Sequence, residues 1–275
     1  LSGERPLARQ PHSIEFEQVR FRYLERDVLK HLSFCMKPEE TLGLLGRTGS
    51  GKTTMIRLAS RLYDPTGGRI LIDGVDLRDA RLRDLRRSVA LVTQDVHLFR
   101  GTIRDNLTFF NSNVSDERIW EVLDELSMRS WIGELPEKLD TMLGAGGSGL
   151  SAGQAQLLAF GRAFLRDPGI VILDEPSSRI DPATERLVTR AVDRLLKGRT
   201  GIIIAHRLAT VERVDKIMVL ADGRILEYGS REVLARDPDS RYSMLLRLSA
   251  ESTSLDEQME HIESTTSLDE QMEIV

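Results

Sequence analysis

The residues with the clearest chemical signature lie in a glycine-rich segment between a short apolar run, residues 41–45, and a predicted helix. The segment consists of Gly46, Arg47, Thr48, Gly49, Ser50, Gly51, Lys52 and Thr53, and Thr54 opens the helix. Glycines in a strand-to-helix turn let successive backbone N–H groups point at an anion, and the helix N-terminus adds a positive dipole. In such a loop the lysine bridges the β- and γ-phosphates, and the next hydroxyl holds Mg²⁺. The pattern therefore predicts a phosphate-binding P-loop and a nucleoside triphosphate as its ligand.

A pair of carboxylates, Asp174 and Glu175, follows the apolar run 170–173. Open α/β sheets bind ligands at the carboxyl ends of their strands, so we expect both side chains beside the phosphates. Asp174 is placed to hold Mg²⁺ through its water shell, and Glu175 is then free to polarise the attacking water. A strand that simply ends in a polar turn would show the same pattern. The P-loop in the same chain favours the functional interpretation.

Two further polar residues follow predicted strands. His206 comes directly after residues 202–205, and Gln94 comes shortly after residues 89–92. Taken alone, each could be an ordinary packed or surface side chain. Beside a P-loop, we expect both at the phosphate site, where Gln94 could reach Mg²⁺ or the attacking water.

The segment 150–154, Leu-Ser-Ala-Gly-Gln, precedes an apolar helical pattern. Ser151 is predicted to cap this helix, and the small residues Ala152 and Gly153 would leave the helix start open to an anion. Without other evidence this is an ordinary helix start.

The composition limits the class of protein. A chain of 275 residues with 40% apolar residues can form one large α/β domain or two smaller ones. A net charge of −5 and a sequence pI of about 5.7 argue against a dedicated nucleic-acid binder. The single cysteine, Cys35 in the run 32–36, is predicted to be a buried strand residue in a reducing environment. No apolar run approaches the ~18–20 residues of a membrane span, and the start at Leu1 leads us to expect a segment of a longer protein.

The order of elements predicts an α/β fold with a mainly parallel sheet, an antiparallel β subdomain and a helical insertion. Alternation over 14–23 predicts half-exposed strands. Further strands are predicted at 41–45, 69–72, 89–92, 170–173, 202–205, 217–220 and 224–227. Helices are predicted at 182–196 and 230–248, and strand character is absent from about 100 to 166. We therefore expect a linker at 1–12, a domain at 13–248 with its helical insertion at about 95–166, and a tail at 249–275.

The tail contains a repeat, because residues 254–260 recur as residues 267–273. Each copy opens with a Ser-x-x-Glu capping box, but two copies are too few for a solenoid. The tail is either an acidic helical extension or a segment without function, and it has no apolar face wide enough to join a core.

Taken together, these elements resemble the ATP-binding domain of ABC transporters over about residues 13–248. The ordered set carries the resemblance more than any short motif except the P-loop. It implies ATP and Mg²⁺ as ligands, with the metal held by Thr53, Gln94 and Asp174. It implies catalytic roles for Lys52, Gln94, Glu175 and His206. The remaining nucleotide contacts that it implies, beyond the P-loop from Gly46 to Thr54, are Tyr23 on adenine, Ser151, Gly153, Gln154 and Asp181.

The family resemblance also implies partners. In the family, two such domains meet head to tail. Each ATP then lies between the P-loop of one domain and the helix start at residues 150–154 of the other. Residues 95–106 and 204–210 look most like exporters, in which the ATPase is commonly fused behind a transmembrane domain. We therefore expect a second ATP-binding domain, an upstream transmembrane domain, a location at the cytoplasmic face of a membrane, and no nucleic acid. The alternative is a soluble ABC-type ATPase acting on translation or DNA.

The chain departs from the family pattern at several positions. Ala152 stands where the family usually has glycine, and Ala155 replaces a usual arginine. Ala145 and Gly146 replace a usual Glu-Arg pair, and Arg179 occupies a place where a small residue is usual. The altered positions lie in elements donated to a partner, so the chain could be one half of a heterodimeric exporter; neutral drift would produce the same pattern.

Overall fold

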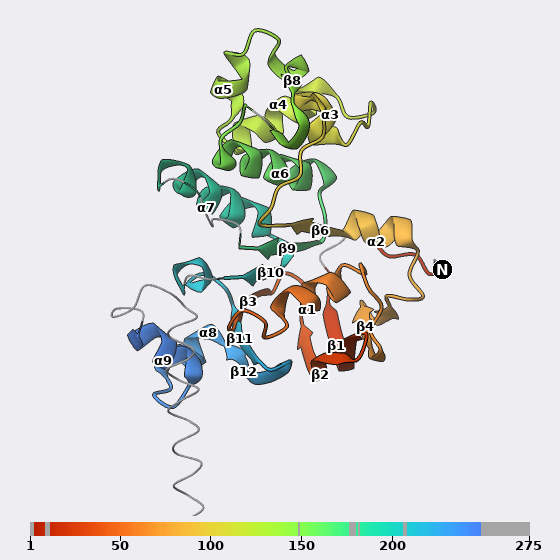
Figure 1. Ribbon diagram of the computed structural model, residues 1–275, viewed down its shortest axis with the longest axis vertical. Coiled ribbons are helices and arrows are strands. Elements are labelled where there is room, and N and C mark those ends of the chain that lie inside the picture. Colours follow the sequence, from red (N-terminus) through yellow and green to blue (C-terminus); the bar gives the residue numbers. More distant parts are fainter. Residues whose placement is uncertain are drawn as a thin grey trace, which may run out of the picture.

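A six-stranded sheet forms the centre of the fold, with strand order β12-β11-β3-β10-β9-β6 (Figure 1). The computed structural model describes residues 3–8, 12–147, 149–175, 180, 182–205 and 208–248. The strands are β3 (Thr41–Leu45), β6 (Val89–Val92), β9 (Ile170–Asp174), β10 (Thr200–Ile204), β11 (Lys216–Ala221) and β12 (Arg224–Ser230). All neighbours pair in parallel except the edge strand β12, which is antiparallel to β11. The near-continuous apolar runs are buried, as parallel strands covered on both faces require.

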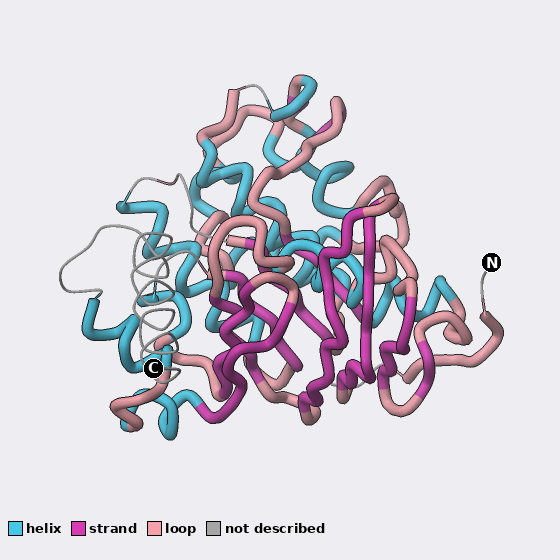
Figure 2. Tube along the Cα trace, turned by 60° about the horizontal axis from the view of Figure 1, so that its bottom comes forward, coloured by secondary structure: helices cyan, strands magenta, loops and turns pink. Residues whose placement is uncertain are grey.

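A second sheet is antiparallel, with strand order β2-β1-β4-β5. Its strands are β1 (Ile14–Tyr23), β2 (Arg26–Met36), β4 (Gly67–Ile72) and β5 (Val75–Asp76). Figure 2 shows the strands gathered in the middle of the molecule, with most of the helices above them and to the left. One hydrophobic cluster joins Phe16 and Leu32 of this sheet to Leu44 and Ile202 of the central sheet. The predicted fold class, a mainly parallel core with an antiparallel β subdomain and a helical insertion, is confirmed.

The prediction for Cys35 is wrong. Cys35 is exposed, while its neighbours Phe34 and Met36 are buried. Successive side chains of a strand point to opposite faces, so burying Phe34 and Met36 turns the cysteine outward. The apolar character of the run identified a strand but not the face on which each residue lies.

Helices cover the central sheet. They include α1 (Lys52–Ala59), α2 (Leu82–Ser88), α7 (Pro182–Leu196), α8 (Arg231–Arg236) and α9 (Arg241–Leu248), and the short turn η3 (Leu208–Val211). The single helix predicted at 230–248 is therefore two helices. The helix α8 ends at Arg236, and the next residue, Asp237, is extended because Pro238 disfavours a helical conformation in the residue before it.

The helical insertion lies at one end of the molecule, at the top of Figure 1. It contains α3 (Ile103–Thr108), α4 (Asp116–Glu125), α5 (Arg129–Gly133), α6 (Ala152–Arg166) and the turns η1 (Lys138–Asp140) and η2 (Ala145–Gly147). The prediction that strand character is absent from about 100 to 166 is wrong, because β7 (Gly101–Thr102) pairs with β8 (Met142–Leu143). Strands of two residues are too short to show any periodicity in the sequence.

The first residues of the chain contact the folded domain. Arg5 forms an isolated bridge with Ala80. His12 is fully buried, with its Nδ1 atom 2.6 Å from Oδ2 of Asp73. In the described part of the chain, no helix is long and apolar enough to cross a membrane.

Candidate functional site

The glycine-rich segment forms the turn between β3 and α1, as predicted. Gly51 has a φ of 111°, and an added Cβ atom would lie 2.6 Å from the side chain of Leu29. Gly46 has a φ of 148°, and an added Cβ would lie 2.2 Å from the backbone oxygen of Leu220. Both positions therefore require glycine, because a side chain would meet strained backbone and occupied space.

Lys52 begins α1 and lies inside the loop, with 6% of its surface exposed. Its ammonium group donates hydrogen bonds to the carbonyl oxygen of Gly46 and, at 3.0 Å, to that of Arg47. The hydroxyl of Ser50 is buried and has no hydrogen-bond partner in the described part of the chain. A buried cation and an unsatisfied hydroxyl in a glycine loop at a helix N-terminus fit a phosphate group. The hydroxyl-bearing Thr48 and Thr53 are exposed, and Thr54 is buried.

The carboxyl ends of neighbouring parallel strands bring the other predicted residues to the same edge. Asp174 ends β9 opposite Ile204 of β10, and β6 lies on the other side of β9. Gln94 follows β6 by two residues and is half-buried. The backbone N–H of Glu175 donates to the oxygen of Ile204 at 3.1 Å, and Glu175 has a φ of 49°. A left-handed glutamate is strained, and such strain clusters at functional sites. The predicted Asp181 and His206 lie outside the described residues.

Ser151 caps α6, as predicted. Its hydroxyl accepts from the N–H of Gln154 at 3.1 Å, and the side-chain oxygen of Gln154 accepts from the N–H of Ser151 at 2.9 Å. Gly153 is buried where an added Cβ would lie 2.2 Å from the Thr184 side chain, whereas Ala152 is exposed. The helix start is thus held by its own capping box.

The P-loop helix and the helix that Ser151 caps lie on opposite faces of the central sheet. Met55 and Ile56 of α1 belong to the cluster shared with the antiparallel sheet. Leu158 and Phe160 of α6 belong to the cluster on the other face. The sequence predicted both helix starts as nucleotide contacts, and within one chain the fold separates the two helices.

Tyr23 ends β1 and is half-buried. Its ring packs edge-on against Phe21, with centroids 4.8 Å apart, and against Tyr63, at 5.6 Å. Its hydroxyl is buried without a hydrogen-bond partner among the described residues. The ring is therefore held by aromatic contacts and not by its hydroxyl.

Sequence reasoning missed a polar node in the helical insertion. Asn106 is fully buried and accepts from the N–H of Phe99 at 2.8 Å. The guanidinium of Arg162 donates to the backbone oxygens of Asn106 at 2.7 Å and His97 at 2.8 Å. Burial lowers the pKa of Arg162, and its guanidinium lies 4.8 Å from the ring centre of Phe109. The available signal was an asparagine beside the apolar positions Ile103 and Leu107 of α3.

An exposed aromatic patch surrounds this node. Three rings form the patch: Phe99 is 45% exposed, Phe109 46% and Phe110 59%. The ring centroid of Phe99 lies 6.1 Å from that of each of the other two rings. Exposed clusters of large apolar residues mark interaction surfaces.

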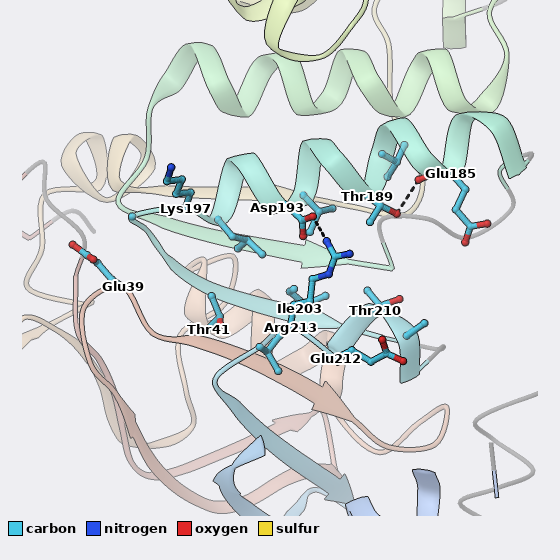
Figure 3. Close-up of a pocket in the computed structure, with 16 residues that line it drawn as sticks. Glu39, Thr41, Glu185, Thr189, Asp193, Lys197, Ile203, Thr210, Glu212 and Arg213 are labelled. Carbon is cyan, nitrogen blue, oxygen red and sulfur yellow. Dashed lines mark hydrogen bonds and ion pairs between the residues drawn. The ribbon is translucent and has the colours of Figure 1, made fainter. Parts of the chain in front are cut away.

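A pocket of about 660 Å³ lies elsewhere, between α7, β10 and the segment 209–214 (Figure 3). Asp193 and Arg213 form an ion pair across it, and Glu185 and Glu212 also line it. Among the described residues, none of those predicted for the nucleotide site contributes to its lining.

A P-loop after one strand of a parallel sheet, with an acidic pair at the end of a nearby strand, defines a P-loop NTPase. The sequence model of the ABC transporter family matches residues 29–178, more than half of the chain. The chain belongs to this family and is an ABC-type ATPase domain.

Known relatives agree with this assignment. The chain is 45% identical over 226 residues to the ABC-type transporter fsqE of Aspergillus fumigatus, covering 80% of this chain and 18% of that protein. It is 42% identical over 250 residues to the ATP-dependent lipid A-core flippase of Pectobacterium atrosepticum, covering 90% of this chain and 43% of that protein. A solved structure of a bacterial Atm1-family ABC exporter with ATP bound matches with a TM-score of 0.83 and 33% identity, covering 91% of this chain and 44% of that one. The chain thus spans less than half the length of these relatives. An ATPase of translation or DNA is not favoured.

Proposed function

We propose that this chain hydrolyses ATP as the motor domain of a longer exporter that moves a substrate across a membrane. The observation that carries the proposal is the P-loop with its buried lysine, Lys52, at the same sheet edge as Asp174 and Glu175. The similarity to a flippase and to an exporter with ATP bound supports the coupling to transport.

The roles of the side chains follow from their chemistry. Lys52 binds the β- and γ-phosphates, and Glu175 accepts a proton from the attacking water. Thr53, Gln94 and Asp174 would hold Mg²⁺, because hydroxyl, amide and carboxylate oxygens are its preferred ligands. When bound, the metal neutralises charge on the phosphate oxygens. Tyr23 stacks on adenine, and His206 takes part in catalysis.

The second ATP-binding domain is the proposed partner at the nucleotide. Because α1 and α6 lie on opposite faces of one sheet, the 151–154 helix start is better placed to serve the ATP of a facing copy than its own. Ser151, Gly153 and Gln154, with Asp181, would then contact the ATP of the partner. This supports a head-to-tail dimer with two ATP molecules at its interface.

The transmembrane domain is the second proposed partner, upstream on the full-length protein at the cytoplasmic face of the membrane. The exposed patch of Phe99, Phe109 and Phe110 supports a docking surface for it. Arg162 anchors this patch to the segment that follows Gln94 through its bond to His97. Movement at the patch would therefore reach the nucleotide site through a few bonded residues.

The pairing of two unlike subunits is a finer proposal. Ala152 is exposed at the start of α6, where its methyl group would face the partner's ATP. A self-paired dimer would present Ala152 to both ATP molecules and should turn over slowly, and Ala152→Gly should raise its rate. Normal turnover that Ala152→Gly leaves unchanged would instead indicate a symmetric exporter.

The test of the main proposal compares three variants of the chain. Lys52→Ala should abolish tight ATP binding, because the phosphates lose their main cation. Glu175→Gln should retain ATP binding and lower turnover by ~10²–10⁴-fold. Glu117→Gln, at an exposed position of α4, is the matched control and should match the unmodified chain. Near-normal turnover of Glu175→Gln would remove Glu175 from catalysis.

A further inference from the structure

A basic pocket of about 640 Å³ lies where the hairpin of β1 and β2 meets the turn between β11 and β12. Four cationic residues line it, namely Arg20, Arg22, Lys30 and Arg224, together with His31. Asp27 is the single carboxylate among the described residues that line it. Within the described ranges, the pocket shares no residue with the predicted nucleotide site.

Distant parts of the chain create this pocket. The backbone N–H of Lys30 donates to the oxygen of Gly223 at 2.8 Å, which places Arg224 beside β2. Gly223 has a φ of 73°, and an added Cβ would lie 2.1 Å from the oxygen of Val28. This close approach requires glycine. The fold therefore brings the cations together through a specific backbone contact.

Among the described residues, the cations of the pocket have no ionic partner. In the part of the chain that the structure describes, the side chains of Arg20, Arg22, Lys30 and Arg224 make no hydrogen bond or ion pair. Elsewhere in the same sheet, by contrast, Arg69 pairs with Glu17. Like charges that lie side by side repel each other. A hollow lined mainly by one sign of charge has a strong electrostatic potential. The arrangement fits a polyanionic ligand.

The chain itself carries a matching polyanion. Residues 251–275 hold eight of the 43 acidic residues and none of the 38 Lys and Arg residues, so the remainder has a net charge of +3. An extended chain spans about 3.3–3.6 Å per residue, so the 27 residues after Leu248 could reach roughly 90 Å. A domain of this size has a radius of gyration of roughly 18 Å, so the pocket is within reach.

We propose that the acidic tail, residues 251–275, docks in the basic pocket of its own chain. Each repeat carries three carboxylates, at 256, 257 and 260 in the first copy and at 269, 270 and 273 in the second. Two acidic clusters on one tether raise the local carboxylate concentration at the pocket to about the millimolar range. Binding through charge needs no wide apolar face on the tail.

The single cysteine makes the proposal testable in the full chain. Cys35 is exposed and lies four residues beyond His31 on β2, which is about 13 Å along the strand. A nitroxide spin label on Cys35 should broaden the ¹³C-methyl NMR signals of Met259 and Met272 at low salt. The signals should recover at high salt, because the Debye length falls from about 30 Å at 0.01 M to about 3 Å at 1 M.

Two triple variants separate pocket binding from general attraction. The first removes three pocket charges with Arg20→Ser, Arg22→Ser and Arg224→Ser, and it should abolish the broadening. The second removes three exposed arginines away from the pocket, with Arg83→Ser, Arg190→Ser and Arg236→Ser, and it should retain the broadening.

Three results would overturn the proposal. The first is that the Met259 and Met272 signals of the unmodified chain are not broadened at low salt. The second is that both triple variants retain the broadening to the same extent. The third is that both triple variants lose it to the same extent. Replacing the tail carboxylates with amides provides an independent check, because it leaves the pocket intact and should also abolish the broadening. If the tail signals are not broadened but inorganic pyrophosphate binds the pocket, the ligand of the pocket is a small anion instead.

Discussion

Asn106 connects the segment after Gln94 to the helical insertion, and its replacement by alanine should destabilise the domain strongly. Its side chain accepts from the Phe99 N–H at 2.8 Å and from Arg162 at 3.0 Å. It also donates to the backbone oxygens of Phe99 and Thr102, both at 3.0 Å. Each neutral bond contributes about 1 kcal/mol, and the bond to the charged arginine about 1.5–3 kcal/mol. Because the site is fully buried, we expect these contributions to add to a loss of roughly 4.5–6 kcal/mol of unfolding free energy.

Calorimetry and thermal shift would measure this effect. A domain of this size loses about 2–4 °C of melting temperature per kcal/mol, so the melting temperature of Asn106→Ala should fall by roughly 10–20 °C. The matched control is Asn111→Ala, which removes one exposed bond to the N–H of Asn113 and should change stability by at most about 0.5 kcal/mol. If Asn106→Ala melted no lower than Asn111→Ala, the four bonds would not stabilise the fold as argued.

Three further predictions concern single side chains. Tyr23→Phe should leave ATP affinity unchanged, because the hydroxyl has no partner among the described residues. Tyr23→Ala should weaken ATP binding by about 1–3 kcal/mol in a titration. Equal losses of affinity in both variants would contradict the stacking role. Gly51→Ala should abolish measurable ATP binding, because Gly51 has a φ of 111° and an added Cβ would meet a leucine of β2. The control Gly133→Ala should bind ATP normally, because the space around Gly133 is open. Thr200→Val should lower the unfolding free energy by about 1–3 kcal/mol in denaturant titrations, because the buried hydroxyl donates to the backbone oxygen of His12 at 2.7 Å. The control Thr200→Ser should retain most of the stability. An unchanged denaturation midpoint for Thr200→Val would show that this bond is not needed.

The features that depend on neighbouring residues could be predicted from the sequence. The P-loop follows from glycines at fixed spacing before Lys52, because the turn and the helix start are local. Ser151 and Gln154 form the predicted capping box because both partners lie within one helical turn. The apolar runs of the parallel strands identified the α/β core and the strand ends at Asp174 and Gln94.

The contacts between distant segments could not be predicted, because they depend on the packing of the whole fold. Cys35 faces outward because strand pairing, and not the apolar run, selects the buried face. Asn106 and Arg162 are 56 residues apart in sequence and meet only when α3 packs on α6. The basic pocket likewise joins Arg20 to Arg224 through a backbone contact at Gly223. No sequence window contains such pairs, because long-range packing and register set their distances.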